Sequence, residues 1–237
     1  MGMWSIKILT LIIAVSLLTI AIAIANPLGA EEVEVMESSR FNDSISPETV
    51  QAQAGNVSEL SITAVAVTRT WQGFYGNITG SLILADSSGN NFYNWNVTSP
   101  SGQVYASRND SVTWDGIACL TGTRLEDEET FLGRTPTDPD SVTNTFTDTN
   151  HPTFLVGTQT ISGCPTTQAY GDGESQDGEF WQVLLDDTNA NTVYTTIIEE
   201  SVVQGFNDRP WHFQLLVGEN GHTGPGTTPY YFYVELS

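Results

Sequence analysis

Four carboxylates lie within eight residues of one another in the sequence GDGESQDGE, where glycines separate them. Ca²⁺ prefers oxygen ligands of this kind, and the glycines would let the backbone turn around an ion. The spacing departs from the Asp-x-Asp-x-Asp-Gly pattern of calcium-binding loops, so we favour the alternative of a solvated acidic turn. The calcium ligands that this loop would offer are Asp172, Glu174, Asp177 and Glu179.

A pair of carboxylates about 5 to 9.5 Å apart could also hydrolyse a glycosidic bond. Asp115, directly after a tryptophan, and Glu179, directly before Phe-Trp, are the formal candidates. Any acidic, aromatic-rich β-protein offers such pairs, however. The chain has no Gly-x-Ser-x-Gly and no Gly-x-x-x-x-Gly-Lys motif, and its three histidines lack metal-ligand spacing. We therefore expect a protein without enzymatic activity and assign no catalytic residue.

Two tyrosines of the final stretch, YYFYVEL, are the candidates for stacking on a sugar ring. Tyr231 and Tyr233 share one face of the strand that this stretch predicts, and Phe232 and Val234 share the other. If the second face packs in a core, the two tyrosines face solvent. Together with the acidic loop, they favour a carbohydrate-binding module, with or without Ca²⁺, as the alternative function.

The two cysteines that follow the N-terminal segment, Cys119 and Cys164, are predicted to form one disulfide. A lone pair of cysteines in an exported protein usually does so. The bridge would close a loop of about 45 residues and, in the chain-entropy model, contribute about 4 kcal/mol to stability. A catalytic cysteine is the alternative, but Pro165 directly follows Cys164, and His151 lies in a Thr/Asp/Pro-rich stretch.

Five Asn-x-Ser/Thr sequons indicate glycosylation of several of these asparagines in an exported protein. Asn77 and Asn96 occupy positions of the predicted strands that are opposite to apolar residues such as Leu82 and Trp95. Because a glycan must point to solvent, we expect those apolar side chains to face a core. The five candidate acceptors are Asn42, Asn56, Asn77, Asn96 and Asn109.

The N-terminus predicts export. Lys7 precedes an uncharged apolar run from Ile8 to Ala25, which has the order of a secretory signal and is also long enough for an uncleaved membrane anchor. Residues 1–25 are therefore a signal peptide or anchor helix, and residues 26–55, rich in Glu and Ser, are an acidic spacer. Membrane contact is expected only through residues 8–25, and only if they are retained.

The formal net charge of −21 excludes nucleic acid as a partner, because phosphates would be repelled. Lys7 is the only lysine, so chemistries that need a lysine outside the N-terminal segment are absent as well. We interpret the acidity as a source of solubility for an exposed protein.

The elements that carry these residues are predicted to be short β-strands. In ELSITAVAV (59–67), Leu60, Ile62 and Ala64 share one parity and Ser61 and Thr63 take the other. Residues 80–97 form two β-prone runs joined by Asp-Ser-Ser-Gly-Asn, in which Gly89 can take a positive φ. Residues 121–150 are predicted to be a long acidic loop, and no helix is expected after the N-terminal segment. Residues 56–237 therefore predict an all-β fold, an antiparallel β-sandwich of about nine or ten strands.

Several motifs support a surface location. TWQGFYGNITGSLILADSSGN, YNW, HFQLLVGENGH and YYFYVEL resemble motifs that occur together in a group of uncharacterised, exported, β-rich archaeal surface proteins. The resemblance covers about residues 55–237. It implies an extracytoplasmic location and an archaeal source, and it carries no activity.

These observations together predict a secreted or cell-surface glycoprotein with a structural or adhesive role. Its expected partners are other surface proteins or copies of itself. The spacer before Asn56 could donate a strand to the open sheet edge of a neighbour. A carbohydrate-binding module, with glycans as partners, is the alternative, and a secreted glycan hydrolase is the less favoured one.

Overall fold

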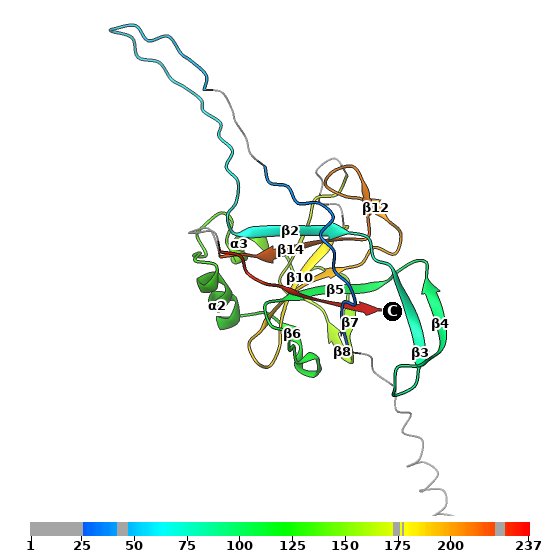
Figure 1. The fold of residues 1–237 in the computed structure, drawn as a ribbon. Coiled ribbons are helices and arrows are strands. Elements are labelled where there is room, and N and C mark those ends of the chain that lie inside the picture. Colours follow the sequence, from blue (N-terminus) through cyan, green and yellow to red (C-terminus); the bar gives the residue numbers. More distant parts are fainter. Residues whose placement is uncertain (1–25, 42–46, 173–175, 177, 221–225) are drawn as a thin grey trace, which may run out of the picture.

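The computed structural model describes residues 26–41, 47–172, 176, 178–220 and 226–237, and its centre is one antiparallel sheet (Figure 1). β9 (Thr166–Gln168) pairs with one strand of this sheet, β10 (Trp181–Asp186). The order of the other strands is β1 (Leu28–Gly29), β15 (Tyr231–Leu236), β5 (Gly102–Ser107), β11 (Thr192–Ile197), β10 (Trp181–Asp186) and β6 (Ala118–Cys119).

The central sheet is buried on both faces. In β5, Val104 and Ala106 belong to one hydrophobic cluster, whereas Tyr105, between them, belongs to a second. Successive side chains of a strand point to opposite faces, so each cluster fills one side of the sheet. All six residues of β5 are buried.

Two further strands and two helices cover the first face. β2 (Trp71–Gly76) and β14 (Phe213–Gly218) form a two-stranded antiparallel sheet above it, and Leu215 and Val217 of β14 enter the first cluster. α2 (Thr123–Phe131) and α3 (Val142–Thr145) lie beside them (Figure 1). The result is a sandwich of two stacked antiparallel layers, as predicted, with a small second layer.

The second face is covered by the hairpin of β7 (Phe154–Val156) and β8 (Gln159–Ile161) and by η1 (Trp114–Gly116). The Trp114 ring lies between Tyr105 and Tyr233, with centroid distances of 5.1 and 5.2 Å. A separate short ribbon, β12 (Val203–Gln204) with β13 (Pro210–Trp211), lies at the edge of the fold.

The expectation that residues 121–150 are a loop without helices is wrong. Leu125 of α2, Leu132 after it and Val142 of α3 pack in the first cluster. The Glu129 carboxylate accepts hydrogen bonds from the first backbone N–H groups of α3, those of Val142 and Thr143 (3.1 and 2.7 Å). A carboxylate at a helix N-terminus is stabilising, so Glu129, itself part of residues 121–150, helps to hold α3 in its helical form.

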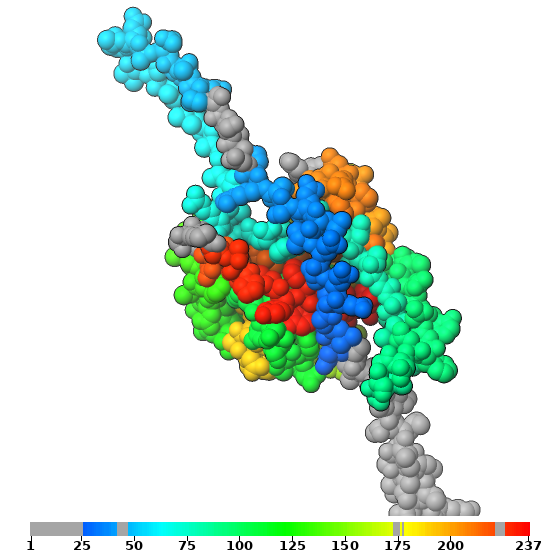
Figure 2. Space-filling model, viewed as in Figure 1, coloured from blue at the N-terminus to red at the C-terminus, as the bar shows by residue number. Residues whose placement is uncertain are grey.

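Residues 80–97 form the predicted hairpin, β3 (Gly80–Ala85) with β4 (Asn91–Val97). Gly89 has φ +82°, as expected, and the Asp86 carboxylate accepts hydrogen bonds from the backbone N–H groups of Ser88 and Asn90. The expectation that the apolar face of this hairpin enters the core is wrong, because Trp95 and Leu84 are each 50% exposed. The hairpin projects from the body as a separate lobe (Figure 2).

The predicted strand at 59–67 is also absent. Residues 47–69 are exposed throughout and pair with no strand of the described chain. They form a long excursion, here called the arm, that leaves the body on the side away from the hairpin β3–β4 (Figure 1). The apolar–polar alternation is present, but no layer among the described residues buries it.

Candidate functional site

The predicted disulfide is confirmed. Cys119 of β6 and Cys164 are bonded and lie 45 positions apart in the sequence, with a Cα–Cα distance of 4.9 Å. Cys164 is fully buried in the second cluster, and the backbone N–H of this residue donates to Nε2 of His151 (3.1 Å). The bridge therefore joins the edge of the central sheet to the loop before β9.

The calcium site in the acidic loop 172–179 remains a prediction. Glu174 and Asp177 lie outside the described residues, and Asp172 and Glu179 flank them. Within the described ranges, no group of three or more His, Cys, Asp or Glu side chains is placed to hold a metal ion.

The two carboxylates proposed for glycoside hydrolysis do not form a pair. Glu179 precedes β10, whereas Asp115 of η1 lies by the turn after β10, where the backbone N–H of Thr113 donates to Asp187 (2.9 Å). A strand of six residues spans roughly 17–20 Å, which is well beyond the spacing of a catalytic pair.

The prediction that Tyr231 and Tyr233 both face solvent and could stack on a sugar is also wrong in part. Tyr231 is 44% exposed, but Tyr233 is only 8% exposed, and its hydroxyl donates to the backbone oxygen of Asn109 (3.0 Å). The expectation that both rings face solvent overlooked the layer of β7, β8 and η1 that covers this side of the sheet. A single half-exposed ring is left.

Four of the five sequons lie in the described residues. Asn56, Asn77 and Asn96 are exposed, and Asn109 is half-buried, with its side-chain nitrogen donating to Asn191 (2.8 Å). Asn42 lies outside the described residues. Glycosylation at these positions stays a prediction.

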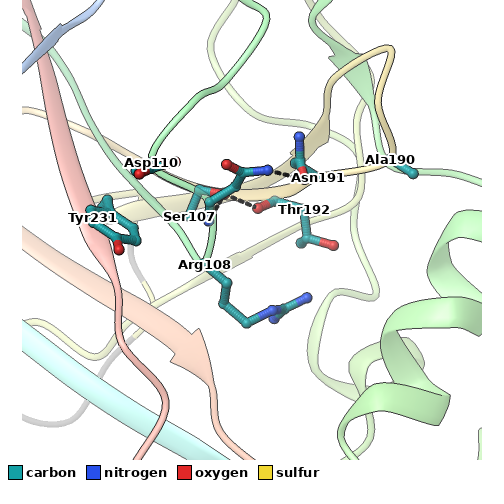
Figure 3. Close-up of a pocket in the computed structure, with 8 residues that line it drawn as sticks. Ser107, Arg108, Asp110, Ala190, Asn191, Thr192 and Tyr231 are labelled. Atoms are coloured by element: carbon teal, nitrogen blue, oxygen red, sulfur yellow. Dashed lines mark hydrogen bonds between the residues drawn. The ribbon is translucent and has the colours of Figure 1, made fainter.

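Tyr231 lines a shallow polar pocket of about 280 Å³ at the ends of β5 and β11 (Figure 3). Its lining groups already bond to one another: the Ser107 hydroxyl donates to the Thr192 backbone oxygen (2.9 Å), and Asn109 donates to Asn191. Figure 3 shows the Arg108 side chain pointing toward α2, away from Tyr231. The geometry offers a ligand little beyond the half-exposed ring.

Arg108 instead joins a buried ionic network that no sequence pattern predicted. The Glu128 carboxylate, 2% exposed, accepts two hydrogen bonds from Arg108, one from Thr192 (2.7 Å) and one from the Tyr194 hydroxyl. The guanidinium also lies 3.9 Å from the ring centroid of Phe131. Burial disfavours the charge, but the hydrogen bonds and attraction from Glu128 raise the pKa of Arg108 above its usual value. This fully bonded network fixes α2 to the central sheet.

The hairpin β3–β4 carries the most distinct apolar surface. Leu82 pairs with Trp95, and Leu84 pairs with Tyr93, so these four side chains share one face. Each is between 49% and 57% exposed, and the rings of Tyr93 and Trp95 are 4.8 Å apart. The reverse face carries Asn94 and Asn96 but also Ile83, which is 58% exposed. A two-stranded hairpin is only marginally stable in water unless its apolar face is covered.

A second apolar surface is a groove of about 590 Å³ between β2 and β15. Phe74 of β2 and Phe232 of β15 form its inner wall, with ring centroids 5.2 Å apart. Residues 26–41 cross β15, as Figure 2 shows: Leu28 and Gly29 pair with it, and Val33 and Val35 line the groove. Those two valines remain 58% and 71% exposed, so they cover the groove only partly.

No protein-family model, curated protein or solved structure matches this chain. Among the residues that the structure describes, no helix is long and apolar enough to cross a bilayer, and the apolar run 8–25 lies outside them.

Proposed function

We propose that this protein is a non-enzymatic structural or adhesive subunit of a cell surface, which acts through contacts with copies of itself. The observation that carries the proposal is the bare apolar face of the hairpin β3–β4. Four large side chains meet there on a projecting lobe, and each of them is about half exposed. Monomeric proteins rarely expose contiguous apolar surface of this kind, and such surface marks a contact site.

The remaining features agree with this role. The disulfide and the doubly covered central sheet make a durable body. The sequons at Asn56, Asn77 and Asn96 are exposed, as glycan acceptors on a surface protein must be. The apolar run 8–25 supports export, and the resemblance noted above supports an archaeal, extracytoplasmic setting.

The proposal is tested by the size of the full chain after export, measured by sedimentation over a range of concentrations. We expect association that strengthens with concentration and weakens in the double variant Leu84→Ser, Trp95→Ser. Asn94→Ser, on the reverse face of the same hairpin, is the matched control and should associate like the natural chain. A chain that stays monomeric at every concentration would refute the proposal.

A further inference from the structure

The second layer of the sandwich, the sheet of β2 and β14, has a free edge at β2. β2 pairs with β14 on one side only, and no strand of the described chain pairs with its other edge. Beyond that edge lies the groove over β15, where Phe74 and Phe232 are only partly buried. A strand placed there would pair with β2 and cover these rings.

The arm has the properties of the missing strand. Leu60, Ile62 and Ala64 share one parity of residues 59–67 and alternate with Ser61 and Thr63. Leu60 and Ile62 are 57% and 83% exposed. The nine residues are more than long enough to match the six of β2. A strand-forming sequence without a sheet and a sheet edge without a strand therefore occur in one chain.

The arm does not fill the groove of its own chain in this structure, because its root is bonded to the loop that carries Asp140. An intramolecular hairpin with β2 would need a tight turn at residues 68–70. Instead, the hydroxyls of Thr68 and Thr70 both donate to the Asp140 carboxylate (2.7 and 2.8 Å), and Arg134 donates to the Thr70 hydroxyl (2.6 Å). Trp71, the first residue of β2, donates through Nε1 to the Asp140 backbone oxygen (2.8 Å).

We infer that residues 59–67 of one copy add as a strand to the free edge of β2 in a second copy and fill its groove. Leu60, Ile62 and Ala64 would face Phe74 and Phe232, while Ser61 and Thr63 would face solvent. This inference rests on the proposed self-association and adds a second contact, between the arm and β2, to the contact made by the hairpin β3–β4. It replaces the spacer before Asn56 as the donor, because that spacer already pairs with β15 of its own chain through Leu28 and Gly29.

The segment now beside the groove can yield to the incoming strand. Ala30 donates to the backbone oxygen of Phe232 (3.0 Å), and within the described residues no backbone hydrogen bond joins residues 31–36 to the body. Val33 and Val35, mostly exposed, can therefore move aside while β1 remains paired with β15.

The first test introduces a charge into the donor of the full exported chain. Ile62→Asp should weaken association on the order of 10- to 100-fold, because an aspartate cannot replace a buried isoleucine. Ser61→Asp, on the solvent side of the same strand, is the matched control and should associate normally. Both positions are exposed in the single chain, so neither variant should change its melting temperature.

The second test locates the acceptor by mixing two single-cysteine variants under mild oxidation. Thr63→Cys should cross-link with Gly73→Cys, whose position in β2 is open, and no native cysteine in the described chain is free to compete. Cross-linking of Thr63→Cys with Asn94→Cys instead would make the hairpin β3–β4 the acceptor and overturn the inference. Normal association of Ile62→Asp would overturn it too and leave the proposed function intact, whereas a chain that never associates refutes that function.

Discussion

Replacing Glu128 by alanine is expected to be among the most destabilising changes available in this fold. The Glu128 carboxylate is the acceptor for Arg108, Thr192 and Tyr194, and it is 2% exposed. Its removal leaves the Arg108 guanidinium, whose side chain is 22% exposed, without its counter-charge. Breaking a buried ion pair from one side costs about 3–5 kcal/mol. For a chain of this size, that loss corresponds to a decrease in melting temperature of about 6–20 °C.

The assay is chemical denaturation followed by tryptophan fluorescence, with Glu126→Ala as the matched control. Glu126 lies in the same helix and is exposed, so its replacement should change the free energy of unfolding by no more than about 0.5 kcal/mol. The double variant Arg108→Met, Glu128→Leu should recover part of the loss, because it leaves no unpaired charge, although the Thr192 and Tyr194 hydroxyls still lose their acceptor. A loss below about 1 kcal/mol in Glu128→Ala would refute the assignment of this network as the anchor of α2.

Three further changes test the body of the fold. Replacing Cys119 and Cys164 by serine should lower the free energy of unfolding by about 4 kcal/mol, measured by urea denaturation, and an unchanged midpoint would contradict this. Burial opposes ionisation of Asp187, but hydrogen bonds, including one from the Thr113 backbone, hold its pKa below 3.8. The ionised Asp187 therefore contributes to the free energy of unfolding above pH 3.8, and this contribution is lost as the pH falls through the lower pKa of the folded state. Asp187→Asn should therefore be less stable than the natural chain at pH 6, with a difference that shrinks below about pH 4 in urea titrations. Gly102→Ala should lower the melting temperature sharply, because Gly102 has φ +119° and a Cβ there would lie 1.9 Å from a backbone oxygen of β15. An unchanged melting temperature would contradict this close contact between β5 and β15.

Sequence periodicity predicted correctly which side chains of a strand share a face. In the last strand, Phe232 and Val234 pack against the first cluster, as their parity predicted. β5 gave no such signal, because both of its faces are buried and its residues do not alternate in polarity. The residue pattern therefore did not predict this strand of the central sheet.

The same reasoning failed where alternation is real but none of the residues that the structure describes covers the apolar face. The hairpin β3–β4 and residues 59–67 both have strand patterns, yet Trp95 is 50% and Ile62 is 83% exposed. Parity indicates which side chains share a face, and it cannot indicate whether a second layer exists. The Arg108–Glu128 network was missed for a related reason: an acidic run such as EDEE is usually solvated, and only the tertiary fold brings an arginine to it.

Amide hydrogen exchange of residues 59–67 tests the central claim most directly. The measurement compares the associated protein with the same protein diluted until it dissociates. If residues 59–67 add to a sheet, the backbone amides of Ile62 and its neighbours should exchange slowly in the associated state and within seconds in the dissociated state. The amides of β5 should stay protected in both states. Fast exchange of the arm in the associated state would contradict strand donation.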